Sequence, residues 1–340
     1  MQKEINSDYL AVAIITYNRI NHLKKLIASL QKNTFAKFTD VYVAVDFPSR
    51  EQDKQANAEI CEFIKGEFPE FKSFTPIIRE KNYGPGPNAV ALRAEILKTH
   101  KDCIFMEDDL EVAPNFLEYM NTAYDYYKDD PTVISISGYS YPIDYVVDEG
   151  ATCMKQQLQM RVWGAVQYQS KYPPLREYII QGGLVKDFDY ALKSKKFNRL
   201  ANFAQFTYIH NALKLLDEPN NFITRATDEA IRILLTVKGY YQVIPTKSLV
   251  KNNGYDGTGI TCPDVKNWHG DFDYDYGSQK VDLGEFRFQP DTLNEFKKNK
   301  KLVNKFDTRN MFKVRLKLFF YKLLGKKLYF SIRKKIKKVK

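Results

Sequence analysis

The strongest constraint on the fold is the alternation of strand-like and helix-like segments in the first 130 residues. Short apolar runs occupy residues 10–15, 41–45, 74–78 and 103–106. Each run is followed by apolar residues at helical spacing, as at Leu23, Ile27 and Leu30. Such alternation is typical of a parallel sheet covered by helices. We therefore predict an α/β fold with a Rossmann-like, mostly parallel central sheet and flanking helices.

The pattern is less regular after residue 130. Strands are expected at 133–137 and 241–244, and helices at 186–195, 206–216 and 229–237. The polar, glycine-rich stretch 251–261 is either a plain loop or a lid, because its glycines permit motion. These changes of pattern divide the chain into residues 1–130, 131–292 and 293–340.

Charge is distributed unevenly along the 340 residues. The net charge is +11, yet residues 311–340 hold 12 Lys or Arg and no Asp or Glu. The other 310 residues hold 40 basic and 41 acidic side chains. A neutral body argues against nucleic acid as its partner, and the basic segment indicates a separate partner.

The cysteines restrict the class of protein further. The four of them, at 61, 103, 153 and 262, form no CxxC pair, so a zinc site is not expected. Unpaired cysteines suit a reducing compartment. The sequence shows neither a signal-peptide pattern nor an apolar run of ~18 residues. We expect a cytoplasmic protein.

Three adjacent carboxylates, Glu107, Asp108 and Asp109, follow the fourth apolar run. Adjacent anions raise one another's pKa values, so a cation is expected near them. Mg²⁺ and Mn²⁺ commonly take one or two protein carboxylates while a nucleotide diphosphate supplies further oxygens. Alternatively, the carboxylates cap the helix expected after residue 114.

Other polar side chains follow neighbouring strands of the predicted sheet. Asn18 and Arg19 come after the first run, and Asp46 comes after the second. The carboxyl ends of parallel strands share one edge of a sheet, and α/β proteins bind ligands there. We therefore expect these side chains to converge with the acidic cluster.

The stretch EDDLEVAPNFLEYM, residues 107–120, is very similar to the metal-binding stretch of N-acetylglucosaminyltransferase I. Together with the alternating pattern, it makes the chain resemble the GT-A fold glycosyltransferases. The resemblance implies that Asp109 contacts Mn²⁺ or Mg²⁺, and that Glu107 and Asp108 contact the sugar and ribose of a UDP-sugar. It also implies a nucleotide-sugar-binding half before residue 130 and an acceptor-binding, catalytic half at 131–292.

Two upstream segments carry the same resemblance. IITYNR is similar to the first strand and turn of that family, which places Thr16, Asn18 and Arg19 near the donor nucleotide. YVAVD is similar to the second strand, whose last residue, here Asp46, reads uracil. Each has a plain alternative, because Asp46 could cap a helix and Arg19 could be a solvated surface charge.

The loop REKNYGPG, residues 79–86, resembles the Asn-x-Gly loop of family 2 glycosyltransferases. The resemblance implies that Asn82 and Gly84 lie near the donor. The Ala-Arg-Asn that follows in that family is absent here. Asn and Gly are also the residues that turns require, so the loop could be only a turn.

A candidate catalytic base lies in TDEAIRILLTVKGYYQV, residues 227–243. An inverting transferase needs a carboxylate to take the proton of the acceptor hydroxyl. The stretch resembles the family 2 pattern of Glu-Asp, a helix and Lys-Gly-Tyr, which places Asp228 in that role and Glu229 second. Thr227 stands where that pattern has Glu. Thr-Asp-Glu is also a common helix start.

Three further residues are candidates for ligand contacts. The resemblance places the zone of Arg161 and Trp163 near the donor phosphate and the acceptor, where Arg could bind diphosphate through two hydrogen bonds. Trp163 could equally be a packing residue. His269 is either a metal ligand, as in some GT-A enzymes, or a structural side chain.

Residues 311–340 predict a basic amphipathic helix, linked to the body by the charged stretch 293–309. Apolar residues recur every four positions, at Leu316, Phe320, Leu324, Leu328, Ile332 and Ile336. Such helices lie in anionic membrane surfaces. Docking on the body and RNA binding are the alternatives. We predict membrane contact, hence a peripheral protein on the inner face of the membrane and a lipid-linked acceptor.

The whole pattern predicts a metal-dependent, inverting glycosyltransferase that moves a sugar from a UDP-sugar to a glycan acceptor in bacterial surface polysaccharide synthesis. Two other functions stay open. A nucleotidylyltransferase would normally have glycines after the first strand, and residues 16–19 have none. A catalytically inactive, membrane-associated glycan-binding protein with a transferase fold is the second alternative.

Overall fold

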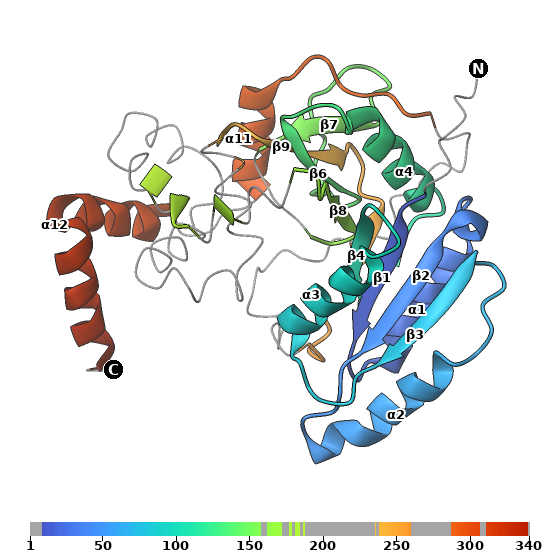
Figure 1. Ribbon diagram of the computed structural model, residues 1–340. Helices are drawn as coiled ribbons and strands as arrows, with labels where there is room; N and C mark the ends of the chain where they lie inside the picture. The colour runs from blue at the N-terminus through green and yellow to red at the C-terminus, as the bar shows by residue number, and fades with distance from the viewer. Residues whose placement is uncertain are drawn as a thin grey trace.

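The computed structural model describes residues 9–157, 162–171, 177–178, 181–183, 186–187, 235, 238–259, 287–306 and 311–338. Strands and helices alternate in its first half (Figure 1). The strands are β1 (Ala11–Thr16), β2 (Asp40–Val45), β3 (Ser73–Ile78) and β4 (Cys103–Glu107). The intervening helices are α1 (Ile20–Gln31), α2 (Lys54–Phe63) and α3 (Pro85–Ile96), with 3₁₀ turns at Ala36–Phe38 and Glu51–Asp53.

The described strands form an eight-stranded sheet in the order β3-β2-β1-β4-β8-β6-β9-β7. Its first four strands are parallel. The second half contributes β6 (Val133–Ser137), β7 (Cys153–Gln156), β8 (Ala165–Gln167) and β9 (Tyr241–Pro245). β6 and β9 are parallel, whereas β7 and β8 run antiparallel to their neighbours. The predicted α/β architecture with a mostly parallel central sheet is confirmed.

Helices cover both faces of the parallel half. Ala13 and Ile15 of β1 pack in one cluster with Leu92 of α3. Val12 and Ile14 belong to the cluster on the other face, which contains the apolar side of α1. Because both faces are buried, β1 reads as one continuous apolar run.

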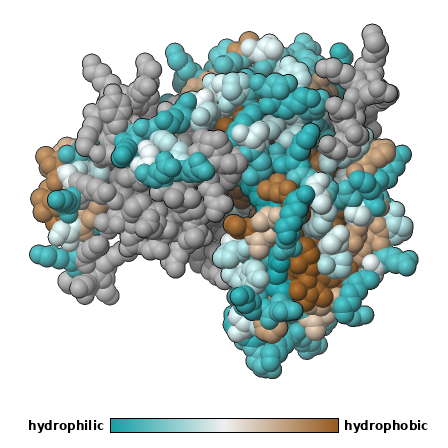
Figure 2. Space-filling model, in the orientation of Figure 1, coloured by the Kyte–Doolittle hydropathy of each residue, from teal (hydrophilic) through white to brown (hydrophobic). Residues whose placement is uncertain are grey.

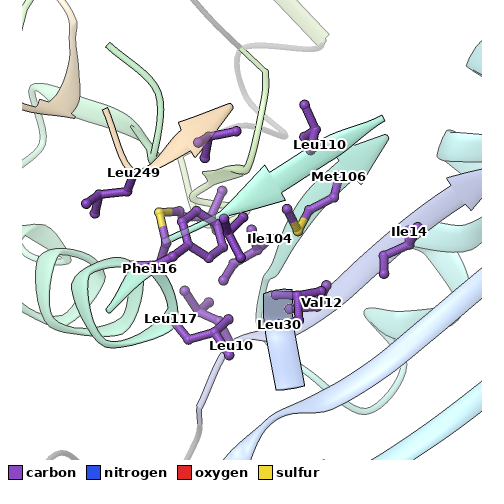
Figure 3. Close-up of a cluster of buried hydrophobic side chains, with 14 of the residues drawn as sticks. Leu10, Val12, Ile14, Leu30, Ile104, Met106, Leu110, Phe116, Leu117 and Leu249 are labelled. Carbon is purple, nitrogen blue, oxygen red and sulfur yellow. The ribbon is translucent and has the colours of Figure 1, made fainter. Parts of the chain in front are cut away.

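The main core joins segments that are far apart in the sequence (Figure 3). Phe116 and Leu117 open α4 (Phe116–Tyr127) and are fully buried. They belong to one cluster with Ile104 of β4 and with Leu249, which precedes β10. This core therefore holds the end of β4 against the second half of the chain.

A second, two-stranded sheet pairs β5 (Leu110–Val112) with β10 (Val250–Asn252) in antiparallel register. The sequence pattern does not predict these strands, because each has only three residues. β5 directly follows the acidic cluster. The pairing therefore brings the start of the glycine-rich stretch 251–261 next to that cluster.

The C-terminal helices are α11 (Phe296–Phe306) and α12 (Met311–Lys338). α11 lies in the stretch expected to be a charged link, yet Asn299 and Val303 are fully buried. The side chain of Asn299 accepts a hydrogen bond from the backbone N–H of Val146 at 2.7 Å and donates one to its carbonyl at 2.9 Å. α11 is therefore packed on the body. The helices expected at 186–195, 206–216 and 229–237 lie entirely or almost entirely outside the described residues.

Candidate functional site

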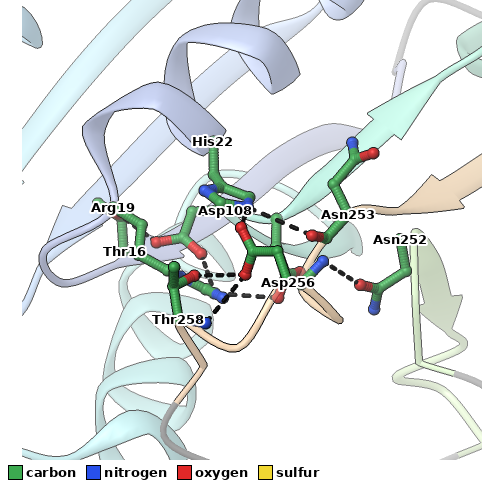
Figure 4. Close-up of polar contacts among 10 residues, drawn as sticks. Thr16, Arg19, His22, Asp108, Asn252, Asn253, Asp256 and Thr258 are labelled. Atoms are coloured by element: carbon green, nitrogen blue, oxygen red, sulfur yellow. Dashed lines mark hydrogen bonds and ion pairs between the residues drawn. The ribbon is translucent and has the colours of Figure 1, made fainter. Parts of the chain in front are cut away.

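The acidic cluster lies at the carboxyl edge of the sheet, where β1 and β4 are neighbours (Figure 4). Thr16, the last residue of β1, donates a hydrogen bond from Oγ1 to Asp108 Oδ2 at 2.8 Å. The guanidinium of Arg19 forms an ion pair with Asp108 and a second with Asp109, whose Oδ2 lies 3.0 Å from Nη2. The structure thus brings together four residues that the sequence predicts as a site.

Burial and charge act against each other in this cluster. Burial raises the pKa of Asp108, Arg19 lowers it, and the neighbouring charge of Asp109 raises it again. Burial also opposes the charge of Arg19, but the two carboxylates outweigh it and raise the pKa of the guanidinium. Arg19 therefore serves as the cation that the adjacent carboxylates need in the free protein.

One carboxylate oxygen of the cluster is left without a protein partner. Asp109 Oδ1 is buried and has no hydrogen-bond partner among the described residues. A buried oxygen of this kind suits a hard cation, which takes oxygen ligands. No three His, Cys, Asp or Glu side chains gather to hold a metal in the part of the chain that the structure describes.

The start of the glycine-rich loop lies directly on this cluster. The backbone N–H of Asn253 donates to the carbonyl of Asp109 at 2.8 Å. A Cβ at Gly254 would lie 2.1 Å from Asp109 Oδ2, so any larger residue there would have to displace the carboxylate or the loop. His22 Nε2 lies 3.1 Å from Asp256 Oδ2 and 3.3 Å from the carbonyl of Asn253. The loop is thereby tied to α1 as well as to β5.

These loop contacts are not predicted from the sequence. His22 follows Arg19 by one helical turn, and this spacing places it on the same side of α1. The Asn-Gly and Asp-Gly pairs indicate turns, but they do not say which strand the loop meets. The pairing of β5 with β10 supplies that information, and it exists only in the folded chain.

Asp46 is buried and its carboxylate is occupied by backbone groups. It accepts hydrogen bonds from the N–H groups of Phe47 at 3.0 Å, Tyr83 at 2.8 Å and Gly84 at 2.8 Å. Gly84 has φ of 76°, a conformation that favours glycine. Asn82 adds a hydrogen bond from Nδ2 to the carbonyl of Phe47 at 2.6 Å. Asp46 thus ties the loop before α3 to the end of β2, and its contact with uracil stays a prediction.

Asn18 points away from the acidic cluster, toward Asp53. Its Nδ2 donates to Asp53 Oδ1 at 2.9 Å, and the hydroxyl of Tyr17 donates to Oδ2 at 2.8 Å. Arg50 bonds the same carboxylate through Nε at 2.7 Å and lowers its pKa. Asn18 therefore joins the turn after β1 to the segment before α2.

Trp163 lies two residues before β8, the strand that pairs with β4. The ring centroid of Trp163 lies 4.7 Å from that of buried Tyr139 and 6.1 Å from that of Tyr255. A row of aromatic rings thus leads to the loop that covers Asp109.

Four predicted residues lie outside the described residues: Arg161, Asp228, Glu229 and His269. Their predicted roles as phosphate ligand, catalytic base, alternative base and possible metal ligand therefore stay predictions.

No family model matches the chain, and no curated protein matches it. Among solved structures, S. aureus TarS in complex with UDP is similar, with 14% identity and a TM-score of 0.39, over 69% of this chain and 57% of that one. TarS with UDP-GlcNAc aligns with 16% identity and a TM-score of 0.35, over 53% of this chain and 47% of that one.

A third similar structure is the mannosyltransferase PcManGT from Pyrobaculum calidifontis with GDP-Man and Mn²⁺. It has 17% identity and a TM-score of 0.34, over 49% of this chain and 46% of that one. The chain spans less than two thirds of the length of each of these proteins. Any proposal for its activity stands on the geometry and the sequence of the site itself.

Proposed function

We propose that this chain is a glycosyltransferase that uses a UDP-sugar and a divalent cation. The observation that carries the proposal is the buried pair Asp108 and Asp109 at the carboxyl end of β4, which shares the single guanidinium of Arg19. Hard divalent ions bind carboxylate oxygens of this kind, and α/β proteins bind nucleotides at this edge. The similarity of residues 107–120 to a metal-binding stretch supports the same assignment.

The residues of the cluster suit the departure of a nucleoside diphosphate. Charge builds on the phosphate oxygens as the sugar leaves, and it has to be stabilised. A divalent ion at Asp109 would supply part of that stabilisation. Arg19 would add hydrogen bonds to the diphosphate through its N–H groups. Thr16 keeps Asp108 oriented through the hydrogen bond at 2.8 Å.

Asp228 is the proposed catalytic base, which takes the proton of the acceptor hydroxyl, and Glu229 is the second candidate for this role. This assignment is supported by the sequence pattern of residues 227–243. A carboxylate at Asp228 takes the proton while the hydroxyl oxygen attacks the anomeric carbon and the bond to the diphosphate breaks. A single displacement of this kind inverts the configuration at that carbon.

The acceptor is proposed to be a glycan, carried on a lipid at the inner face of a bacterial membrane during surface polysaccharide synthesis. The half-buried rings of Trp163 and Tyr255, the latter on the loop that contacts Asp109, support a sugar acceptor, because aromatic faces suit sugar rings. The basic segment 311–340 supports the lipid carrier.

The test is a panel of UDP-sugars incubated with the full chain and Mn²⁺, with UDP release as the readout. We expect release with at least one donor, loss of release on chelation, and loss in Asp109→Asn. Asp102→Asn, at the opposite end of β4, is the matched control and keeps the activity. The proposal would be rejected if the rate of UDP release were unchanged by the chelator and by Asp109→Asn.

Two further readouts separate the alternative functions. Pyrophosphate formed from UTP and a sugar phosphate would favour a nucleotidylyltransferase. No heat of binding for UDP with Mn²⁺ in calorimetry would favour a glycan-binding protein without activity.

A further inference from the structure

α12 is bent at Gly325, which divides it into two helical halves, residues 311–324 and 326–338 (Figure 1). Gly325 has φ of 70° and ψ of 167°, a conformation that is strained for any other residue. The sequence predicts one continuous helix, so the bend is a finding of the structure. At ~1.5 Å per residue, neither half is longer than about 21 Å, which is less than the ~30 Å core of a bilayer.

Aromatic side chains lie inside the bend. Tyr321 before it, and Tyr329 and Phe330 after it, are 4%, 5% and 6% exposed. The ring centroid of Tyr321 lies 5.4 Å from that of Tyr329 and 6.2 Å from that of Phe330. These contacts hold the two halves in their relative orientation. They also show which side of each half-helix is buried by contact with the other half.

Six large apolar side chains of α12 are exposed to solvent. On the first half, the exposed fractions are 44%, 57%, 42% and 66% for Leu316, Phe319, Phe320 and Leu323. At about 100° per residue these four span roughly 100° of the helix circumference, away from Tyr321. On the second half, Leu328 and Ile332 lie one turn apart and are 51% and 38% exposed. Figure 2 shows hydrophobic surface over α12 at the left edge of the molecule.

This arrangement decides between two explanations of the C-terminal segment. A helix docked on the body buries its apolar stripe and leaves its charges in water. α12 differs, because it buries Tyr321, Tyr329 and Phe330 but leaves a second apolar stripe exposed. Among the described residues, six of the twelve exposed large hydrophobic side chains belong to α12. An apolar surface of this kind marks an interaction site.

The charge of the segment indicates which binding partner this apolar surface contacts. Residues 311–340 carry 12 Lys or Arg and no acidic side chain, so a second copy of the segment would be repelled. Nucleic acid would neutralise the charges but would leave the apolar stripe in water. An anionic bilayer meets both requirements, since its headgroups attract the cations and its acyl region accepts the stripe.

We propose that α12 binds the surface of an anionic lipid bilayer as two half-helices, with the stripe of Leu316, Phe319, Phe320, Leu323, Leu328 and Ile332 inserted below the headgroups. Within the described part of the chain, no helix combines the length and apolar character that crossing a bilayer requires. This proposal does not depend on the transfer of a sugar.

The test is flotation of the full chain with vesicles of phosphatidylcholine alone or with 30% phosphatidylglycerol. We expect binding to the anionic vesicles only, weakened about tenfold when NaCl rises from 0.1 to 0.5 M. Phe319→Ser with Leu323→Ser keeps every charge and is expected to weaken binding by at least about tenfold. Ile78→Ser with Val90→Ser, which removes exposed apolar side chains elsewhere, is the matched control and binds as the unchanged chain does.

Three results would overturn the proposal: equal binding to both vesicle types, unchanged binding of the stripe variant, or a dimer in light scattering that the stripe variant loses. Circular dichroism of each variant checks that it is folded, and calorimetry with UDP and Mn²⁺ on the same samples tests the sugar-transfer proposal separately. If the unchanged chain floats with anionic vesicles but binds no UDP, the sugar-transfer proposal fails and the membrane proposal stands.

Discussion

β4 carries buried carboxylates at both ends, and their partners differ. Before the strand, Asp102 is 3% exposed and accepts hydrogen bonds from the hydroxyl of Tyr124 at 2.6 Å and the N–H of Gln169 at 2.9 Å. Burial raises its pKa to about 6. After the strand, Asp108 is equally buried, but it is paired with a guanidinium.

This difference in partners shows that burial alone does not identify a functional carboxylate. Neutral hydrogen-bond partners leave Asp102 able to take up a proton, which suits a role in packing. At the other end of the strand, burial also raises the pKa of Asp108, but there the charge of Arg19 opposes the rise and pairs with the ionised carboxylate. A carboxylate pair stabilised by a cation is what a metal and a phosphate can use. Four variants test whether the two ends of β4 differ in this way.

Asp109→Asn is expected to have the largest effect. It keeps the shape of the side chain but removes its charge, and we expect Mn²⁺-dependent UDP release to fall by about 10³-fold, equivalent to about 4 kcal/mol. The measurement is initial rate against Mn²⁺ concentration. Asp102→Asn is expected to stay within about twofold of the unchanged chain. Similar losses in both variants would remove the distinction between the two ends.

Asp102→Asn is instead expected to change the dependence of stability on pH. The folded pKa of about 6 lies above the ordinary 3.8, so the folded state holds the proton more tightly. That stabilisation is complete below pH 3.8 and is lost as the pH rises through 6. Between these values the unchanged chain loses about 3 kcal/mol that the Asn variant keeps. Urea unfolding at several pH values measures this, and parallel curves for the two chains would contradict it.

Arg19→Met is expected to lower the free energy of unfolding by roughly 2–3 kcal/mol without metal, because it leaves two adjacent carboxylates without their cation. Added Mn²⁺ should recover part of this loss by replacing the charge. Thermal unfolding with and without Mn²⁺ is the measurement. Arg50→Met, which breaks a more exposed pair with Asp53, should have a smaller effect that Mn²⁺ does not change. A loss at Arg19 that Mn²⁺ cannot recover would argue against a cation site.

Gly254→Ala is expected to have the smallest effect on stability, roughly 1–2 kcal/mol, because the added Cβ meets Asp109 Oδ2 at 2.1 Å and the loop has to move. The displaced carboxylate should also weaken the response to Mn²⁺. Gly66→Ala, whose Cβ would lie 3.2 Å from the carbonyl oxygen of Phe63 and 3.9 Å from the ring of Phe68, is the control. Equal Mn²⁺ affinity in the two variants would show that the loop does not position Asp109.

Sequence patterns locate the elements that are long and buried. β1 and β4 are predicted to within about one residue, since strands covered on both faces read as continuous apolar runs. β5, β8 and β10 are not predicted, because each has three residues and is stabilised by pairing with distant segments. A run of that length does not differ from a loop in any local pattern.

The candidate site, too, is predicted only in part from the sequence. Arg19, Asp108 and Asp109 are predicted to converge because the ends of neighbouring parallel strands share one edge, and the structure brings them into contact. Asn18 and Asp46 are predicted at the same edge, yet their side chains bond Asp53 and the loop before α3. Strand order therefore predicts where a residue lies, but not which neighbour its side chain meets.

Local periodicity and a count of charges were enough to establish the α/β order, the carboxylates after β4 and the basic segment, since these properties belong to short stretches of chain. Folding in three dimensions was needed to bring Gly254 against Asp109, to give Asp46 its hydrogen bonds from backbone N–H groups and to turn the exposed apolar stripe of α12 toward solvent. The physical reason is that steric contacts and hydrogen bonds act over a few ångströms. They depend on which distant segments meet, and no local pattern contains that information.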